Sequence, residues 1–197
     1  SFALQKKLKK RKCGEVTALY KDKEYLAQRF AALEKKYSGY KKTQQTLKEW
    51  LRVYNGLEHI KPEWTDMLSK LEAFVANGIT NIHETAEAVN EREYEYEHLL
   101  VYYVYRYFLR AVFDGQLADK VQLACAALIM QEMLGCVYCL SDGSLTFDRQ
   151  ITAMRIYSKE TEHSEENLEV LYKNFGKNKA FSYKAFMGII FGSGLLL

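Results

Sequence analysis

The sequence contains very little proline and cysteine and has no long apolar run. Its 197 residues include one proline, Pro62, and so few helix breakers favour helices over many short strands. Four cysteines are too few for a disulfide-stapled secreted domain, and no signal-peptide pattern precedes them, so we expect reduced thiols in a cytoplasmic protein. No apolar run reaches the roughly 18–20 residues of a membrane helix, so no membrane partner is expected.

Several motifs that bind nucleotides or metals are also absent. The sequence has no GxGxxG, no glycine-rich phosphate loop, no GxSxG and no HExxH, so a Rossmann-type cofactor site is not visible. Cys136 and Cys139 form an isolated CxxC, without a second pair at metal-site spacing. Their apolar flanks favour two small residues at a buried helix end; a metal site and a redox pair are the less favoured interpretations.

The composition is that of a globular helical protein. Apolar residues make up 48% of the chain and charged residues 27%, which is enough to bury a core. Apolar side chains recur every three to four residues, and Gly or Asn separates the segments. We therefore expect an all-α, multi-helix bundle of about 7–8 helices with long central helices. The expected helices span about 2–12, 17–37, 43–54, 62–76, 84–113, 117–140, 147–175 and 183–191, with 99–113 central because it is apolar nearly all round.

Charge is distributed unevenly along the chain. Residues 1–61 hold 16 Lys/Arg and 6 Asp/Glu, a net +10, whereas residues 62–197 hold 12 and 19, a net −7. A basic segment 1–61 packed on a bundle 62–197, within one compact domain, is the expected organisation; the basic half either meets an anionic partner or faces the acidic half. The run 6–12 lacks interleaved aromatic residues, so it is interpreted as a solvated helix face and nucleic acid is not the expected partner.

The segment 157–168 is the densest in polar functional side chains. On one continuous helix, Glu160, His163 and Asn167 would share a face. Such a face suits a general base or a polar socket for a cationic amine, but an ordinary solvated acidic helix has the same pattern.

A second polar and aromatic cluster lies within the apolar segment 99–113. Arginines inside an apolar helix need carboxylate partners, and Glu160 or Glu162 is expected to supply them. Structural ion pairs are one interpretation, and an anchor for an anionic ligand is the other. The cluster consists of Tyr102, Tyr103, Tyr105, Arg106, Tyr107 and Arg110.

A family pattern runs through roughly residues 95–175. It consists of LVYYVYRYFLRAVFDG at 100–115, Lys120-Val121, YSKE at 157–160 and EHSEENL at 162–168. These segments resemble the C-terminal region of bacterial flagellin lysine N-methylases. The resemblance implies methylation of lysine side chains on flagellin, with S-adenosylmethionine as the methyl donor.

Members of that family also carry an N-terminal cysteine-rich module, with a CxxxCC-type cluster proposed to chelate iron or zinc, and nothing in this sequence matches it. The resemblance therefore implies a helical domain that supports substrate binding and is not catalytically complete alone. It also implies that any metal ion or iron–sulfur cluster is bound by the cysteine-rich module and not by this sequence. The alternative is a non-enzymatic helical protein–protein interaction module. The candidate polar site comprises Glu160, Glu162, His163, Glu166, Asn167, Tyr105, Arg106 and Arg110.

Overall fold

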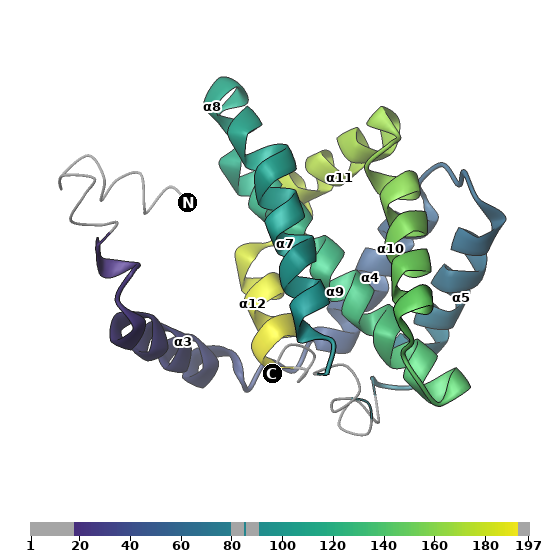
Figure 1. Cartoon of the computed structure of the whole chain (residues 1–197), viewed down its shortest axis with the longest axis horizontal. Helices are drawn as coiled ribbons and strands as arrows, with labels where there is room; N and C mark the ends of the chain where they lie inside the picture. The colour runs from purple at the N-terminus through teal and green to yellow at the C-terminus, as the bar shows by residue number, and fades with distance from the viewer. Residues whose placement is uncertain (1–17, 80–84, 86–90, 193–197) are drawn as a thin grey trace.

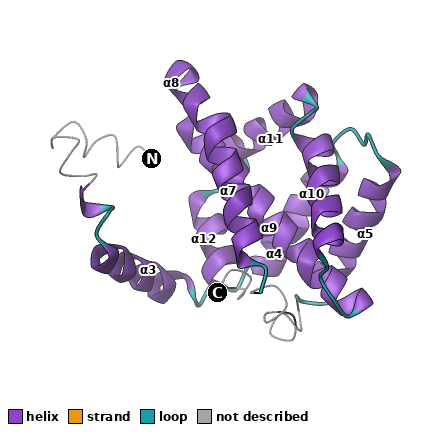
Figure 2. Ribbon diagram, viewed as in Figure 1, coloured by secondary structure: helices purple, strands orange, loops and turns teal. Residues whose placement is uncertain are grey.

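The structure is a computed structural model that describes residues 18–79, 85 and 91–192. Within these ranges the chain forms helices and no strand (Figures 1 and 2), which confirms the expected all-α bundle. The expected helix at 2–12 lies outside the described residues. The elements are α3 (Lys23–Tyr37), α4 (Thr43–Asn55), α5 (Pro62–Ala76), α7 (Glu93–Tyr107), η1 (Phe108–Arg110), α8 (Ala111–Asp114), α9 (Leu117–Asp142), α10 (Phe147–Thr161), α11 (Glu165–Lys177), η2 (Lys179–Phe181) and α12 (Tyr183–Gly192).

Helix α9 forms the centre of the bundle. It contacts α5, α7, α10, α11 and α12, and it buries Leu123, Ile129 and Met133 completely. By length and composition α9 could cross a membrane, whereas no apolar run of that length was expected from the sequence. Because 72% of its most apolar 18-residue window is buried inside the bundle, its hydrophobicity matches that of a core helix.

Aromatic side chains join helices from the two ends of the sequence. Trp50 of α4 stacks on Phe181 of η2, with ring centroids 4.7 Å apart, and its indole Nε1 donates to the Ala180 carbonyl at 2.6 Å. Trp64 of α5 meets Tyr157 of α10 edge to face at 5.8 Å. Helices on both sides of residue 61 thus share one core, while the division at that residue stays a prediction.

The segment 99–113 is not the central helix that its composition predicted. Its residues continue from α7 through η1 into α8, which projects beyond the bundle (Figure 1). One side packs on α9 and buries Tyr103 and Tyr107, but Tyr105, Leu109 and Phe113 are 76%, 68% and 91% exposed. The prediction was wrong because apolar character on all sides was taken as burial on all sides.

Candidate functional site

The segment expected to be one helix, 147–175, is divided by a short turn. Helix α10 ends at Thr161, and Ser164 begins α11 by accepting a hydrogen bond from the Asn167 backbone N–H. Two glutamates follow in the first turn of α11, where the helix dipole favours acidic side chains. Glu160, His163 and Asn167 therefore do not share a helix face, and that part of the prediction was wrong.

Glu160 and Asn167 hold the loop that leads into α5. Both side chains are buried, and the Glu160 carboxylate accepts the backbone N–H groups of Ile60 and Lys61 at 2.8 and 2.6 Å. Asn167 accepts from the Glu58 N–H through Oδ1 and donates through Nδ2 to the carbonyl oxygens of Glu58 and Glu160. These contacts satisfy the polar atoms of both side chains inside the protein.

Glu162 lies in the turn between α10 and α11 and has a different set of partners. Its carboxylate is 7% exposed and accepts hydrogen bonds from three tyrosines of α7. Tyr102 and Tyr107 donate to Oε2, each at 2.9 Å, and Tyr103 donates to Oε1 at 3.0 Å. The structure thus brings Glu162, one of the predicted site residues, together with the aromatic cluster of α7. We call Glu162, Tyr102, Tyr103 and Tyr107 the tyrosine–glutamate cluster.

Burial and the neighbouring Glu162 carboxylate both favour the phenol form of these tyrosines. Burial, followed by the negative charge of Glu162, raises the pKa of Tyr102 to about 12. The same two causes raise the pKa of Tyr103 and of Tyr107 well above the ordinary value. All three hydroxyls therefore stay protonated at neutral pH and act as donors to the carboxylate.

The arginines of the predicted site lie at or beyond the edge of the tyrosine–glutamate cluster. Arg106 is exposed, lies 5.7 Å from the ring centroid of Tyr107 and is attracted by Glu162. Neither Arg106 nor Arg110 forms an ion pair within 4.0 Å with a described carboxylate, so the expected Arg–Glu pairs are not seen in the described part of the chain. Both side chains reach solvent and need no buried partner.

The remaining predicted site residues are not among the hydrogen-bond partners of Glu162. His163, Glu166 and Tyr105 are exposed, and Glu166 accepts only a long 3.4 Å hydrogen bond from Ser164. Tyr105 was among the predicted site residues, whereas Tyr103 and Tyr107, whose rings stack 5.6 Å apart, were named only in the aromatic cluster. Their spacing of four residues was a readable signal, because residues four apart on a helix lie on the same side.

Cys136 and Cys139 lie on α9 in surroundings that disfavour a thiolate. Cys136 is buried, and burial raises its pKa to about 11. The neighbouring Glu132 carboxyl is also buried, and burial raises its pKa to about 9. A thiolate is the form that binds metals and attacks disulfides. Among the described residues, no group of three or more His, Cys, Asp or Glu side chains could hold a metal ion.

Comparison with known proteins gives one family. The family model described as the FliB lysine N-methylase C-terminal domain matches residues 3–189. No curated protein and no solved structure matches the chain. The matched range includes the tyrosine–glutamate cluster and extends from before α3 into α12, well beyond the 95–175 segment in which the pattern was first seen.

Proposed function

Because this chain belongs to the family of FliB lysine N-methylase C-terminal domains, we propose that it is the substrate-binding part of an S-adenosylmethionine-dependent flagellin lysine N-methylase. In this proposal the domain works in the cytoplasm and is not a complete catalyst alone. The observation that carries the proposal is the family match over residues 3–189, nearly the whole chain.

The tyrosine–glutamate cluster has the chemistry to receive a lysine side chain. A carboxylate offers about four lone-pair positions, and the three tyrosine hydroxyls occupy three of those on Glu162. A lysine ammonium at the remaining position would gain a charge-assisted hydrogen bond and contact with tyrosine rings. Tyr102, which is 40% exposed, is where a side chain from solvent would enter. In this proposal, the role of this chain is to bind the side-chain amine of the flagellin lysine.

Neither the tyrosine–glutamate cluster nor the cavity between α3, α4 and α12 fits the whole methyl donor. S-adenosylmethionine carries a sulfonium cation and a nucleoside, so it needs a cavity that tolerates positive charge. The tyrosine–glutamate cluster has suitable charge, but its rings are packed against one another. The cavity between α3, α4 and α12 has room, but six lysines line it and would repel the cation. We therefore assign no described residue to donor binding, and S-adenosylmethionine is implied by the family alone.

A binding measurement with matched variants tests the role of Glu162. We expect Glu162→Gln to weaken flagellin binding by about tenfold, since one charged hydrogen bond to an ammonium contributes roughly 1.5–3 kcal/mol. Tyr102→Phe should give a smaller loss without disturbing the core. Glu169→Gln is the control, because Glu169 is exposed and pairs only with Lys173 on the surface of α11. Biolayer interferometry measures all four proteins.

Two results would overturn this function. Equal flagellin affinity in the wild type and in both Glu162→Gln and Tyr102→Phe, with unchanged melting temperatures, would exclude the tyrosine–glutamate cluster as the lysine site. Methylated flagellin lysines produced by this chain alone with S-adenosylmethionine, detected by mass spectrometry, would show that it is catalytically complete.

An exposed apolar surface favours a second function, that of a non-enzymatic interaction module. Helices α7, η1 and α8 form a rod that projects beyond the bundle at α8 (Figure 1). Exposed apolar side chains recur along this rod at intervals of three to four residues. Contiguous exposed apolar surface marks protein contacts in soluble proteins. We take flagellin, the partner that the family resemblance implies, as the occupant. The surface consists of Val101, Val104, Tyr105, Leu109, Val112 and Phe113.

Substitution on this rod separates the two functions. If the rod is the docking surface, Leu109→Ser with Phe113→Ser should weaken flagellin binding at least about tenfold, whereas Glu162→Gln should leave it unchanged. Val170→Ser with Tyr183→Ser removes exposed apolar groups elsewhere and is the control. Unchanged flagellin binding by the rod variant, measured beside sedimentation velocity to detect self-association, would reject the interaction module.

A further inference from the structure

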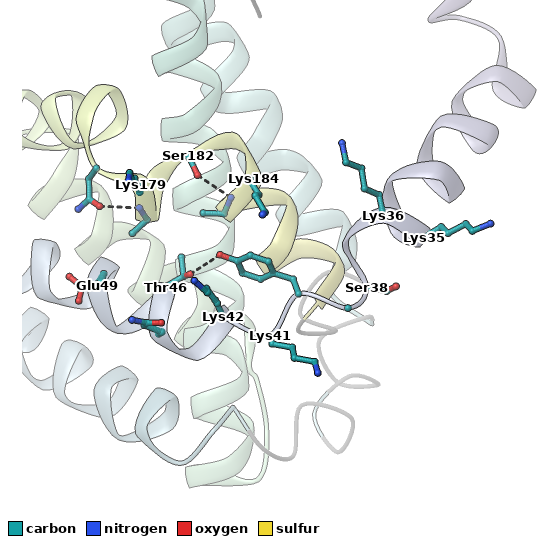
Figure 3. Close-up of a pocket in the computed structure, with 16 residues that line it drawn as sticks. Lys35, Lys36, Ser38, Lys41, Lys42, Thr46, Glu49, Lys179, Ser182 and Lys184 are labelled. Atoms are coloured by element: carbon teal, nitrogen blue, oxygen red, sulfur yellow. Dashed lines mark hydrogen bonds between the residues drawn. The ribbon is translucent and has the colours of Figure 1, made fainter.

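A cavity of about 1030 Å³ lies between the end of α3, the connection to α4, and the segment from η2 into α12 (Figure 3). It shares no residue with the tyrosine–glutamate cluster. The charged residues of its lining are mostly positive, with six lysines and a single carboxylate, Glu49. We call it the lysine pocket. The lysines are Lys35, Lys36, Lys41, Lys42, Lys179 and Lys184.

The positive charge of the lysine pocket is not neutralised by the described parts of the protein. None of the six lysines forms an ion pair within 4.0 Å with a described carboxylate. The one acidic residue of the lining, Glu49, has both carboxylate oxygens 2.7 Å from the Arg52 guanidinium and adds little negative potential of its own. Six lysines along the lining of one cavity give this part of the surface a positive potential that attracts an anionic group, although Lys35, Lys36 and Lys41 extend away from the cavity (Figure 3).

The start of α4 adds to this potential. Lys42 is the N-cap residue, no side chain caps the first turn, and that turn contains no acidic residue. The positive end of the helix dipole therefore lies at the pocket wall, where Lys42, Gln45 and Thr46 are part of the lining. The lysines supply the charge, and the helix end acts in the same direction.

Close packing of α12 on the α3–α4 connection holds the two sides of the pocket together. The ring of Tyr40 lies where a Cβ on Gly188 would be, 2.4 Å from its nearest ring atom, so only glycine allows this approach. The Tyr40 hydroxyl also bonds the Thr46 hydroxyl at 3.1 Å. The connection that carries Lys41 and Lys42 thereby lines the same cavity as Lys179 and Lys184, which come from the opposite end of the sequence.

The side chains around the pocket indicate the class of ligand. The lining contains no arginine, so it lacks the planar fork that reads a phosphate through two parallel hydrogen bonds. Its one aromatic residue, Tyr40, has its ring against Gly188 and is not free to stack on a base. Lysines on flexible stems suit several carboxylates spaced along an extended chain.

We propose that the lysine pocket binds an acidic segment of a partner protein, one with several Asp or Glu side chains close together. The proposal goes beyond the lysine-methylase function and does not depend on it, because the pocket and the tyrosine–glutamate cluster are separate. The proposal also assigns a function to part of the basic segment 1–61, since four of the six lysines belong to it.

Fluorescence anisotropy with a labelled peptide of twelve glutamates tests the proposal on the whole chain. The pocket variant carries Lys42→Gln, Lys179→Gln and Lys184→Gln. The control carries Lys23→Gln, Lys48→Gln and Lys159→Gln, which are exposed lysines outside the pocket. Both variants have the same net charge and keep the basic run at 6–12, so a difference between them reports the pocket alone. All six positions are exposed, and melting temperatures check that the folds are intact.

The pocket variant should bind the peptide at least about tenfold more weakly than the wild type, since three lost ion pairs contribute roughly 0.5–1 kcal/mol each. The control should stay within about twofold of the wild type. Equal weakening in both variants would overturn the proposal by showing that only net charge matters. Tighter pocket-dependent binding of inorganic triphosphate or of single-stranded DNA than of the peptide would overturn it in favour of a phosphate site or a nucleic-acid site.

Discussion

Glu160, Glu162 and Asn167 lie within eight residues of one another, yet each has a different set of partners. Glu160 and Asn167 bind the backbone of the loop before α5, whereas Glu162 receives three tyrosine hydroxyls from α7. The sequence predicted that Glu160 and Asn167 share a helix face. That was wrong, because a turn after Thr161 reorients every side chain that follows.

At the residue scale, the buried carboxyl of Glu132 predicts how the stability of the protein depends on pH. Burial raises the pKa of its carboxyl from 4.5 to about 9, and its Oε2 atom has no hydrogen-bond partner. Between those two pH values the folded protein holds a proton that the unfolded chain releases, so the free energy of unfolding falls as pH rises. Glu132→Gln cannot ionise and should remove this fall, giving a protein about 4 kcal/mol more stable than the wild type at pH 8.

Urea unfolding at pH 5, 6.5 and 8 measures this effect. Near pH 5 both proteins hold a neutral group at position 132, so their stabilities should converge. Glu169→Gln, on the exposed face of α11, should follow the wild-type profile. Parallel pH profiles for the wild type and Glu132→Gln would show that the buried carboxyl is not the cause.

At the element scale, local signals placed most helix ends within a few residues. Pro62 begins α5 in its first turn, and Gly56 and Asn77 follow the last residues of α4 and α5. The break between α10 and α11 contains neither Gly nor Pro and was missed. A readable signal was present, since Ser164 followed by two glutamates is a helix start.

The approach of α12 to Tyr40 gives a prediction at the same scale. Gly188→Ala should destabilise the protein by about 1–3 kcal/mol, because the new Cβ would overlap the Tyr40 ring and force it to move. Gly176→Ala is the matched control. It lies within α11 with nothing within 4 Å of a new Cβ, so it should stabilise by about 0.5–1 kcal/mol. Denaturant unfolding of both variants gives the comparison, and equal effects would contradict the close contact.

At the scale of the whole molecule, the shared aromatic core predicts one cooperative transition. Both tryptophans, Trp50 and Trp64, lie within the first 64 residues but pack on Phe181 and Tyr157. Tryptophan fluorescence and far-UV circular dichroism should therefore report the same urea midpoint. A fluorescence transition at clearly lower urea than the loss of helix would instead indicate two units divided near residue 61.

The sequence by itself determined the helical class and the apolar helix α9, because helical periodicity, caps and stop signals act between residues a few positions apart. It also indicated the family, through short sequence segments between residues 100 and 168. Only the tertiary structure decided which polar groups meet. Tyr103 and Glu162 are 59 positions apart, and Trp50 and Ala180 are 130 apart. The four lysines of the basic segment and the two near α12 form one pocket only because α12 packs against Tyr40. Such contacts depend on how whole helices pack, which spacing within a single helix does not encode.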